Sequence, residues 1–256
     1  MSEKLTGKPK KVMRLPLGST LIGRTHAFVQ IDIKQIRNSG YQIIRNFGTD
    51  VQEFEKVFDH ISSSQLYYSE RIGSVCHQYH VEVSSNNLSQ QMRTGGFHSD
   101  FMFQEHPPEY IALLCLQTDP KHPFYGRNQV VAMSPLIQRL HEGFSLSLEA
   151  LLERQLPYHF TNGQHFNLPL LSNIHGQLQF KYHQHLVTEN KATSTYIAQL
   201  HAAMIDVAED VCLNLGDVLI LSNHHALHRR GECTVSHDST KNVWNSRKMA
   251  SIRFNL

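Results

Sequence analysis

The chain has 256 residues, of which 40% are hydrophobic and 18% are charged. This length suits one large domain with a full core, and the composition is that of an ordinary globular protein. Lysine and arginine number 24 against 22 acidic residues, and so small a net charge gives no electrostatic reason to expect a nucleic-acid or membrane partner. The unusual feature is the count of 18 histidines, because histidine is the commonest metal ligand in proteins.

No segment has the pattern of a targeting or membrane-spanning sequence. The longest uninterrupted apolar run covers residues 110–116, whereas a transmembrane helix needs about 20 apolar residues. The four cysteines lie far apart and form no C-x-x-C pair, which favours a reduced, cytoplasmic compartment. We expect residues 1–20 to form a flexible basic arm and residues 21–256 to form a single domain.

Apolar residues at helical spacing predict four helices. In chain order these cover residues 51–66, 136–144, roughly 147–155, and 195–209. The second follows Ser134 and Pro135, which are typical of an N-cap and of the first helical position.

Short apolar or alternating runs predict the strands. They cover residues 76–83, 110–116, 130–133, 178–187, 218–222 and 248–254. Residues 156–176 are predicted to be rich in loops. Strands concentrated in the central and C-terminal parts, with helices between them, predict a mainly β fold with an antiparallel core and inserted helices.

The first candidate functional motif is His98-Ser99-Asp100, which follows Gly95-Gly96. A histidine and an aspartate two positions apart point to the same side of an extended segment, so both side chains can reach one ion. Because the chain has 18 histidines, such a pair also arises by chance, and a surface turn is the simpler interpretation of this motif alone.

The second candidate motif follows the apolar strand at residues 218–222, where His224, His225 and His228 stand close together. His228 can meet His98 only through the fold. Two histidines and one carboxylate are the ligands of non-haem Fe(II) oxygenases. Zinc hydrolases use the same ligand types, but their H-E-x-x-H motif is absent from the sequence, which favours iron.

The order of motifs over residues 95–256 resembles that of the Fe(II)/2-oxoglutarate-dependent dioxygenases of the taurine dioxygenase and clavaminate synthase type. In that family the H-x-D motif is followed by a proline-led apolar strand, and here Pro108 precedes such a strand. A glycine turn then leads into the next strand, as Gly126 does. The distal segment begins with Gly216-Asp217, has Asn223 before the second histidine, and is followed by an arginine-led last strand.

The resemblance implies a double-stranded β-helix core, which is a jelly-roll or cupin-like fold. It implies that His98, Asp100 and His228 bind Fe(II), and that 2-oxoglutarate and O2 are cosubstrates. Arg247 would grip the distal carboxylate of 2-oxoglutarate, as suits a bidentate guanidinium, and Arg253 is the alternative. Gln129 stands where the family has a threonine that touches the cosubstrate, and its longer side chain departs from that pattern.

Four further residues are candidates for contact with the substrate. Glu82 lies on the strand that leads to the H-x-D motif and would pair with a cationic group of the substrate. His224 and Arg230 flank His228, and Trp244 precedes Arg247. A packing or surface role is the alternative for each. A third group of histidines, His175, His183 and His185, is expected to line the outer sheet or to face solvent.

The resemblance implies hydroxylation of an unactivated C–H bond in a small molecule, with release of succinate and CO2. The carboxylate of Asp100 favours hydroxylation over halogenation, because related halogenases have a small residue at this position. We expect a free amino acid as substrate, with the basic amino acids among the candidates. A non-catalytic cupin-like metal-binding or sensor protein and a zinc-dependent hydrolase with the same ligands remain as alternatives.

Overall fold

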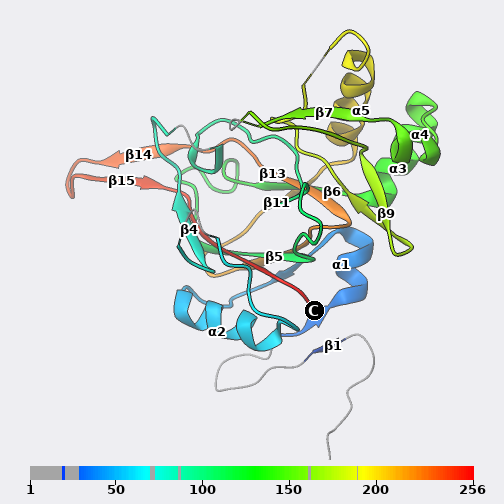
Figure 1. Cartoon of the computed structure of the whole chain (residues 1–256). Coiled ribbons are helices and arrows are strands. Elements are labelled where there is room, and N and C mark those ends of the chain that lie inside the picture. The colour runs from blue at the N-terminus through cyan, green and yellow to red at the C-terminus, as the bar shows by residue number, and fades with distance from the viewer. Residues whose placement is uncertain (1–18, 21–28, 70–72, 86–87, 161–162, 189) are drawn as a thin grey trace, which may run out of the picture.

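The computed structural model describes residues 19–20, 29–69, 73–85, 88–160, 163–188 and 190–256. Its centre consists of two antiparallel sheets that face each other across a shared apolar interior (Figure 1). The predicted arm at residues 1–20 falls almost entirely outside the described residues. Within them, Ser19–Thr20 (β1) pairs with Ile31–Asp32 (β2).

The larger sheet has five strands in the order β3-β12-β5-β16-β4. These strands are β3 (Tyr41–Ile44), β12 (Val218–Ser222), β5 (Tyr110–Gln117), β16 (Lys248–Phe254) and β4 (His77–His80). β5 is buried on both faces: Ile111 and Leu113 face the interior, while Ala112 and Leu114 pack beneath the helices on the outer face. This double burial explains why the sequence of β5 is continuously apolar rather than alternating.

Two helices lie against the outer face of the larger sheet (Figure 1). They are α1 (Ile33–Ser39) and α2 (Val51–Ile61). α2 begins after Asp50, whose carboxylate accepts hydrogen bonds from the N–H groups of Gln52 and Glu53, and it buries Phe54 and Phe58. The sequence predicted this helix but placed its end five residues too late.

The smaller sheet has the strand order β11-β6-β13. These strands are β11 (Glu209–Val211), β6 (Asn128–Ala132) and β13 (Ala226–Arg230). The segment around His98 continues this sheet beyond β13, and the segment around His183 continues it one step further. β6 and β13 therefore lie in the middle of an extended layer whose inner face looks toward the larger sheet.

Most of the chain between β6 and β11 forms an insertion that packs on the outer face of the smaller sheet, although its segment around His183 joins the layer itself. Its helices are α3 (Met133–Phe144), α4 (Leu148–Glu153) and α5 (Ser194–Val207). Its strands are β7 (Leu156–His159), β8 (His165–Leu168), β9 (Leu171–Ile174) and β10 (Gln177–Phe180). The prediction of a loop-rich stretch at residues 156–176 was wrong, because three short strands occupy it, and the predicted strand at 178–187 is regular only at its start.

The remaining elements lie near β4. A short 3₁₀ turn, η1 (Leu88–Gln90), follows β4, and the hairpin of β14 (Val235–Asp238) and β15 (Val243–Ser246) projects from the body of the molecule (Figure 1). None of the helices in the described part of the chain has the length and apolar character needed to span a bilayer.

Candidate metal centre and cosubstrate pocket

Backbone pairing between neighbouring segments places three histidines side by side. The N–H groups of His98 and His228 each donate to the carbonyl oxygen of the other residue at 3.0 Å. On the other side of His98, the N–H of Ser99 donates to Tyr182, which leaves His98 and His183 as a directly facing pair. Facing residues of an antiparallel pair point to the same side, so the three imidazoles stand on the inner face of the layer.

Gly95 and Gly96 allow this close approach of segments. A Cβ atom on Gly96 would lie 2.9 Å from the Cβ of Gln184 and from the ring of His185. A Cβ atom on Gly95 would meet the backbone of Arg230 at an ordinary 3.5 Å. Close packing therefore favours glycine before the H-x-D motif, and the space for a side chain is smaller at Gly96 than at Gly95.

The side chains of His98, Asp100 and His228 form the only group of at least three potential metal ligands found among the described residues, with ligand atoms within 4.8 Å of one another. Oδ1 of Asp100 lies 3.4 Å from Nε2 of His98 and 3.9 Å from Nε2 of His228. Nδ1 of His98 lies 2.9 Å from the carbonyl oxygen of Gly96, an acceptor that fixes the proton on Nδ1 and leaves the lone pair of Nε2 free for a metal.

Asn223 holds the turn that carries Asp100. Its Oδ1 accepts a hydrogen bond from the N–H of Asp100 at 2.7 Å. Its Nδ2 donates to the carbonyl oxygens of Asp100 and Pro108, both at 2.9 Å. Because Asn223 follows β12 directly, the end of that strand fixes the position of the carboxylate.

The electrostatic environment keeps Asp100 and His228 in the protonation states that a metal requires, whereas it favours a proton on His98 that a metal would have to displace. Burial alone would raise the pKa of Asp100, but Arg253 and the two imidazoles outweigh it and hold that pKa well below its usual value. Burial, reinforced by His98, lowers the pKa of His228 to about 3. Burial also opposes protonation of His98, but its contact with Asp100 outweighs that effect and raises the pKa of this imidazole.

Arg253 of β16 and Arg247, which directly precedes that strand, occupy different places. Nε of Arg253 donates to Oδ2 of Asp100 at 2.8 Å. Arg247 lies deeper, with 4% of its surface exposed, and its Nη2 donates to Oδ1 of Asn128 at 2.8 Å. Nδ2 of Asn128 is buried and has no hydrogen-bond partner within the described residues.

Gln129 points away from the three candidate ligands. On β6 it pairs with Arg229 of β13, and its side chain accepts from Arg229 at 2.6 Å and donates to Asp210 at 2.8 Å. Because side chains alternate along a strand, the residue on the inner face is Asn128, which pairs with Arg230. Gln129 and Asn128 differ by one position in the chain, and a shift of one residue along a strand moves a side chain to the opposite face.

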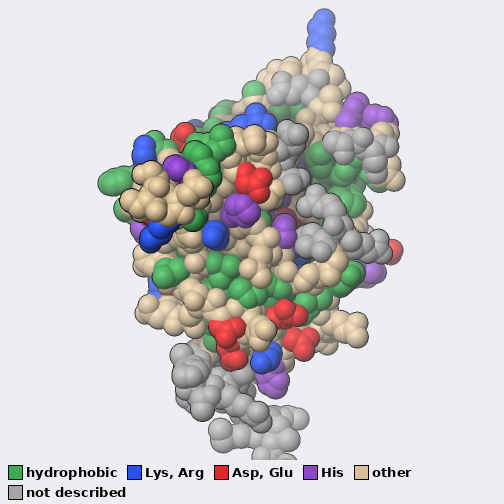
Figure 2. Space-filling model, turned by 90° about the vertical axis from the view of Figure 1, so that its left-hand side faces the viewer, with side chains coloured by type: hydrophobic (Ala, Val, Ile, Leu, Met, Phe, Trp, Pro, Cys, Tyr) green, Lys and Arg blue, Asp and Glu red, His purple; other side chains and the backbone are tan. Residues whose placement is uncertain are grey.

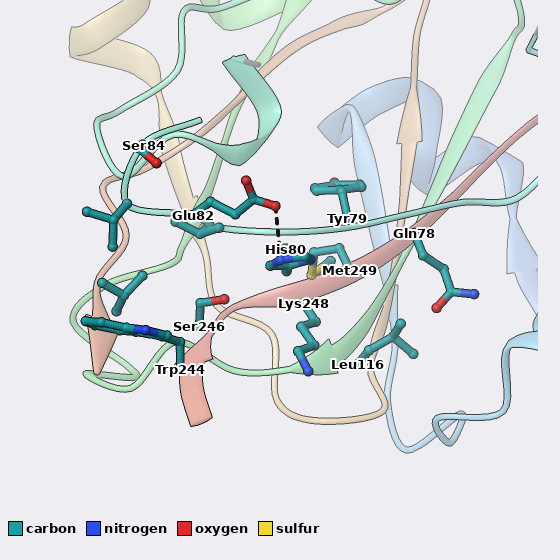
Figure 3. A pocket seen from close by; sticks show the side chains of 13 residues that line it. Gln78, Tyr79, His80, Glu82, Ser84, Leu116, Trp244, Ser246, Lys248 and Met249 are labelled. Atoms are coloured by element: carbon teal, nitrogen blue, oxygen red, sulfur yellow. Dashed lines mark ion pairs between the residues drawn. The ribbon is translucent and has the colours of Figure 1, made fainter. Parts of the chain in front are cut away.

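Glu82 and Trp244 lie in an outer groove rather than beside the candidate ligands. This groove, with a volume of about 650 Å³, runs between β4 and the β14–β15 hairpin and is also lined by His80, Ser246 and Lys248 (Figure 3). Oε1 of Glu82 pairs with Nε2 of His80 at 3.1 Å. The same side of the molecule presents charged, histidine and hydrophobic side chains together (Figure 2).

His224 and Arg230 both have protein partners. Nε2 of His224 lies 3.3 Å from the carbonyl oxygen of Pro107. Arg230 faces the interior, where its guanidinium donates to Sγ of Cys233 at 3.4 Å and to the carbonyl oxygen of Arg93 at 3.0 Å. His224 is thus tied to the loop after the H-x-D motif, and Arg230 lies on the same face as His228.

Sequence reasoning missed His183 and Asn128. The ring centroid of His183 lies 5.0 Å from that of His98, although the sequence placed His183 at the outer sheet or in solvent. Nδ1 of His183 is buried without a hydrogen-bond partner in the described part of the chain. The alternating pattern around His183 does not indicate which face of the strand this residue occupies. Asn128 could have been considered from the sequence, because it is a polar residue directly before Gln129.

The fold and the arrangement of candidate ligands are those of a non-haem iron dioxygenase. The family model described as taurine catabolism dioxygenase TauD, TfdA family matches residues 30–246, so the chain belongs to this dioxygenase family. The predicted family and double-stranded β-helix core are confirmed. A search of curated protein sequences found no match.

Solved structures with the same fold share little sequence with the chain. An asparagine oxygenase, in complex with Fe(II), 2S,3S-3-hydroxyasparagine and succinate, has a TM-score of 0.58 and 17% identity; the match covers 72% of this chain and 57% of that one. The non-haem iron oxygenase OrfP, in complex with Fe and alpha-ketoglutaric acid, has a TM-score of 0.58 and 15% identity over 84% of this chain and 74% of its own. OrfP with Fe and L-Arg has a TM-score of 0.56 and 15% identity over 87% and 76% of the two chains.

Proposed function

We propose that this protein is an Fe(II)- and 2-oxoglutarate-dependent hydroxylase of a small molecule, with a free amino acid as substrate. The observation that carries the proposal is the convergence of His98, Asp100 and His228, whose ligand atoms lie within 4.8 Å of one another. When bound there, iron with 2-oxoglutarate and O2 supplies the oxidising power for C–H hydroxylation and releases succinate and CO2. The protein contributes the ligands, the orientation of both substrates and the exclusion of water.

The ligand set fits ferrous iron. Two imidazoles and one carboxylate on one side of an ion leave its other positions open, which is the arrangement of non-haem Fe(II) oxygenases. His98 offers Nε2 because its Nδ1 faces Gly96. Asp100 is held as an anion by Arg253. OrfP has been solved with Fe and alpha-ketoglutaric acid, which supports the same pair of cofactors for this chain.

Arg247 and Asn128 are the proposed binding groups for the distal carboxylate of 2-oxoglutarate. A buried guanidinium costs several kcal/mol in desolvation unless an anion compensates it, and Arg247 donates a hydrogen bond to the neutral amide of Asn128. The buried Nδ2 of Asn128 has an N–H to donate. A carboxylate between them would satisfy both groups, whereas Arg253 is already engaged by Asp100.

The proposal of an amino-acid substrate is supported by the solved structures of oxygenases that act on asparagine and bind L-Arg. Asp100 supports hydroxylation rather than halogenation, because a carboxylate occupies the position that a halide would need. A basic side chain has less support, since Glu82, its proposed partner, lies in the outer groove and pairs with His80. Glu82 and Trp244 are therefore not part of the proposed substrate site.

The direct test is a panel of free amino acids in which succinate formation from 2-oxoglutarate is measured under air with Fe(II). We expect at least one amino acid to stimulate succinate formation and to be hydroxylated. Asp100→Ala should abolish both, while Asp59→Ala, an exposed position on α2, should leave them unchanged. Normal product formation by Asp100→Ala would refute the ligand set, and activity that survives strict anaerobiosis would favour the zinc hydrolase.

A further inference from the structure

The two oxygens of the Asp100 carboxylate have different neighbours. Oδ1 is the oxygen that approaches both imidazole nitrogens, at 3.4 Å from His98 and 3.9 Å from His228. Oδ2 accepts the Nε hydrogen of Arg253 at 2.8 Å. Oδ1 therefore faces the two candidate histidine ligands, and Oδ2 faces Arg253.

Both ends of the Arg253–Asp100 contact are fixed by the fold. Arg253 lies on β16, where its backbone pairs with Ile111 of the neighbouring strand. Its Nη1 donates to Oγ of Ser251 at 3.3 Å, and Oγ of Ser251 donates to the carbonyl oxygen of His77 at 3.4 Å. Asp100 is held by Asn223, which directly follows β12 of the same sheet. The contact thus joins the larger sheet to the turn after the H-x-D motif.

The charge of Arg253 argues against a role in strengthening metal binding. A guanidinium close to a divalent cation is repelled by it, so the contact does not add attraction for the ion. What a short charge-assisted hydrogen bond does supply is direction. Carboxylates bind cations through one oxygen or through both, and the choice decides how many positions on the ion stay open.

We propose that Arg253 is a positioning residue that keeps Oδ2 away from the iron, so that Asp100 binds through Oδ1 alone. This inference rests on the proposed iron site. Without the guanidinium, the carboxylate can turn and place both oxygens on the ion, which fills a position that a small ligand would otherwise take. Arg253 then acts through Asp100 and is distinct from Arg247, which with Asn128 is proposed to bind the cosubstrate.

The test compares Mn(II)-loaded crystal structures of the wild-type protein, Arg253→Met and Arg253→Lys. Methionine has a similar length but no donor, and lysine retains one donor and the charge. We expect one Asp100 oxygen on Mn(II) in the wild type, with Oδ2 still bound to Arg253. Arg253→Met should bind the ion through both oxygens, and Arg253→Lys should remain bound through one.

Nitric oxide binding to the anaerobic Fe(II)–2-oxoglutarate complex gives a second readout that needs no substrate. The paramagnetic resonance signal of the nitrosyl complex should be largely lost in Arg253→Met and unchanged in Arg139→Met, a control on α3 whose arginine pairs with Asp206. Both Asp100 oxygens on Mn(II) in the wild type, or one-oxygen binding with a full nitrosyl signal in Arg253→Met, would overturn the inference and leave the proposed function standing. Absence of Mn(II) from the three ligands in the wild type would overturn both.

Discussion

Asn128 and Gln129 are adjacent in the chain but face opposite sides of β6. Asn128 touches the buried Arg247, and its Nδ2 is unpaired within the described residues. Gln129 belongs to a polar network on the outer face, where Asp210 and Arg229 are its partners. Substitutions of Asn128 and Gln129 can therefore be compared, because only the side chain of Asn128 lies beside Arg247.

Asn128→Ala should weaken binding of 2-oxoglutarate by about tenfold, because one hydrogen bond to a charged group contributes about 1.5 kcal/mol. Arg247→Gln should weaken it further, since the charge is lost as well. Calorimetric titration of 2-oxoglutarate into the Mn(II)-loaded protein measures both. Gln129→Ala is the matched control, and an equal loss in that variant would return the cosubstrate role to Gln129.

Acid sensitivity of the metal-free protein should depend on His183. Burial, helped by His98 and His185, lowers the pKa of His183 to about 3, whereas a histidine in the unfolded chain titrates near 6.5. Below pH of about 6.5 the unfolded chain therefore binds a proton that the folded chain refuses. The folded state loses up to about 1.4 kcal/mol per pH unit through this residue as the pH falls toward 3.

His183→Gln should accordingly become more stable relative to the wild type by about 2 kcal/mol between pH 7 and pH 5. Urea unfolding at the two pH values gives this difference, with His106→Gln as the control because His106 is exposed. A stability difference between His183→Gln and the wild type that does not change with pH would contradict the buried neutral state of His183.

The proposed iron ligands could be singled out from the sequence because their spacing follows a motif, and the structure brings His98, Asp100 and His228 together. The faces of Gln129 and His183 were not predictable. A one-residue change of register reverses every side chain of a strand, and His183 reaches the site only because its segment pairs with that of His98.

Among the elements, long apolar runs were predicted well and short polar hairpins were not. β5, β12 and β16 form the interior of the larger sheet, and burial leaves a strong pattern in their sequences. β8 and the β14–β15 hairpin are short, with many exposed residues, so tertiary contacts rather than a local apolar pattern determine them.

The segment that carries His183 lies beside the H-x-D motif. Gly96 allows the two segments to pack closely. Gly96→Ala should destabilise the protein by about 1–3 kcal/mol, because the added methyl group overpacks against Gln184 and His185. Gly95→Ala should change stability by less than about 1 kcal/mol, since its Cβ would make an ordinary contact. Urea unfolding of both variants checks this, and equal effects at the two positions would contradict the described packing.

At the scale of the whole molecule, the small net charge conceals a local concentration of positive charge. Arg230, Arg247 and Arg253 all lie on the inner faces of the two layers, while the carboxylate of Asp100 lies among them. An average over 256 residues cannot reveal such a distribution, which arises only when the strands are folded together. This interior suits an anionic cosubstrate, and the many histidines of the composition contribute two proposed ligands.

The most direct test of the account is the consumption of 2-oxoglutarate under air by the wild-type protein and by Asp100→Ala, with and without Fe(II). The proposed function predicts release of succinate and CO2 that requires Fe(II) and O2 and is lost in Asp100→Ala. Failure of the wild-type protein to consume 2-oxoglutarate with Fe(II) and a full panel of amino acids present, or equal consumption by Asp100→Ala, would contradict it.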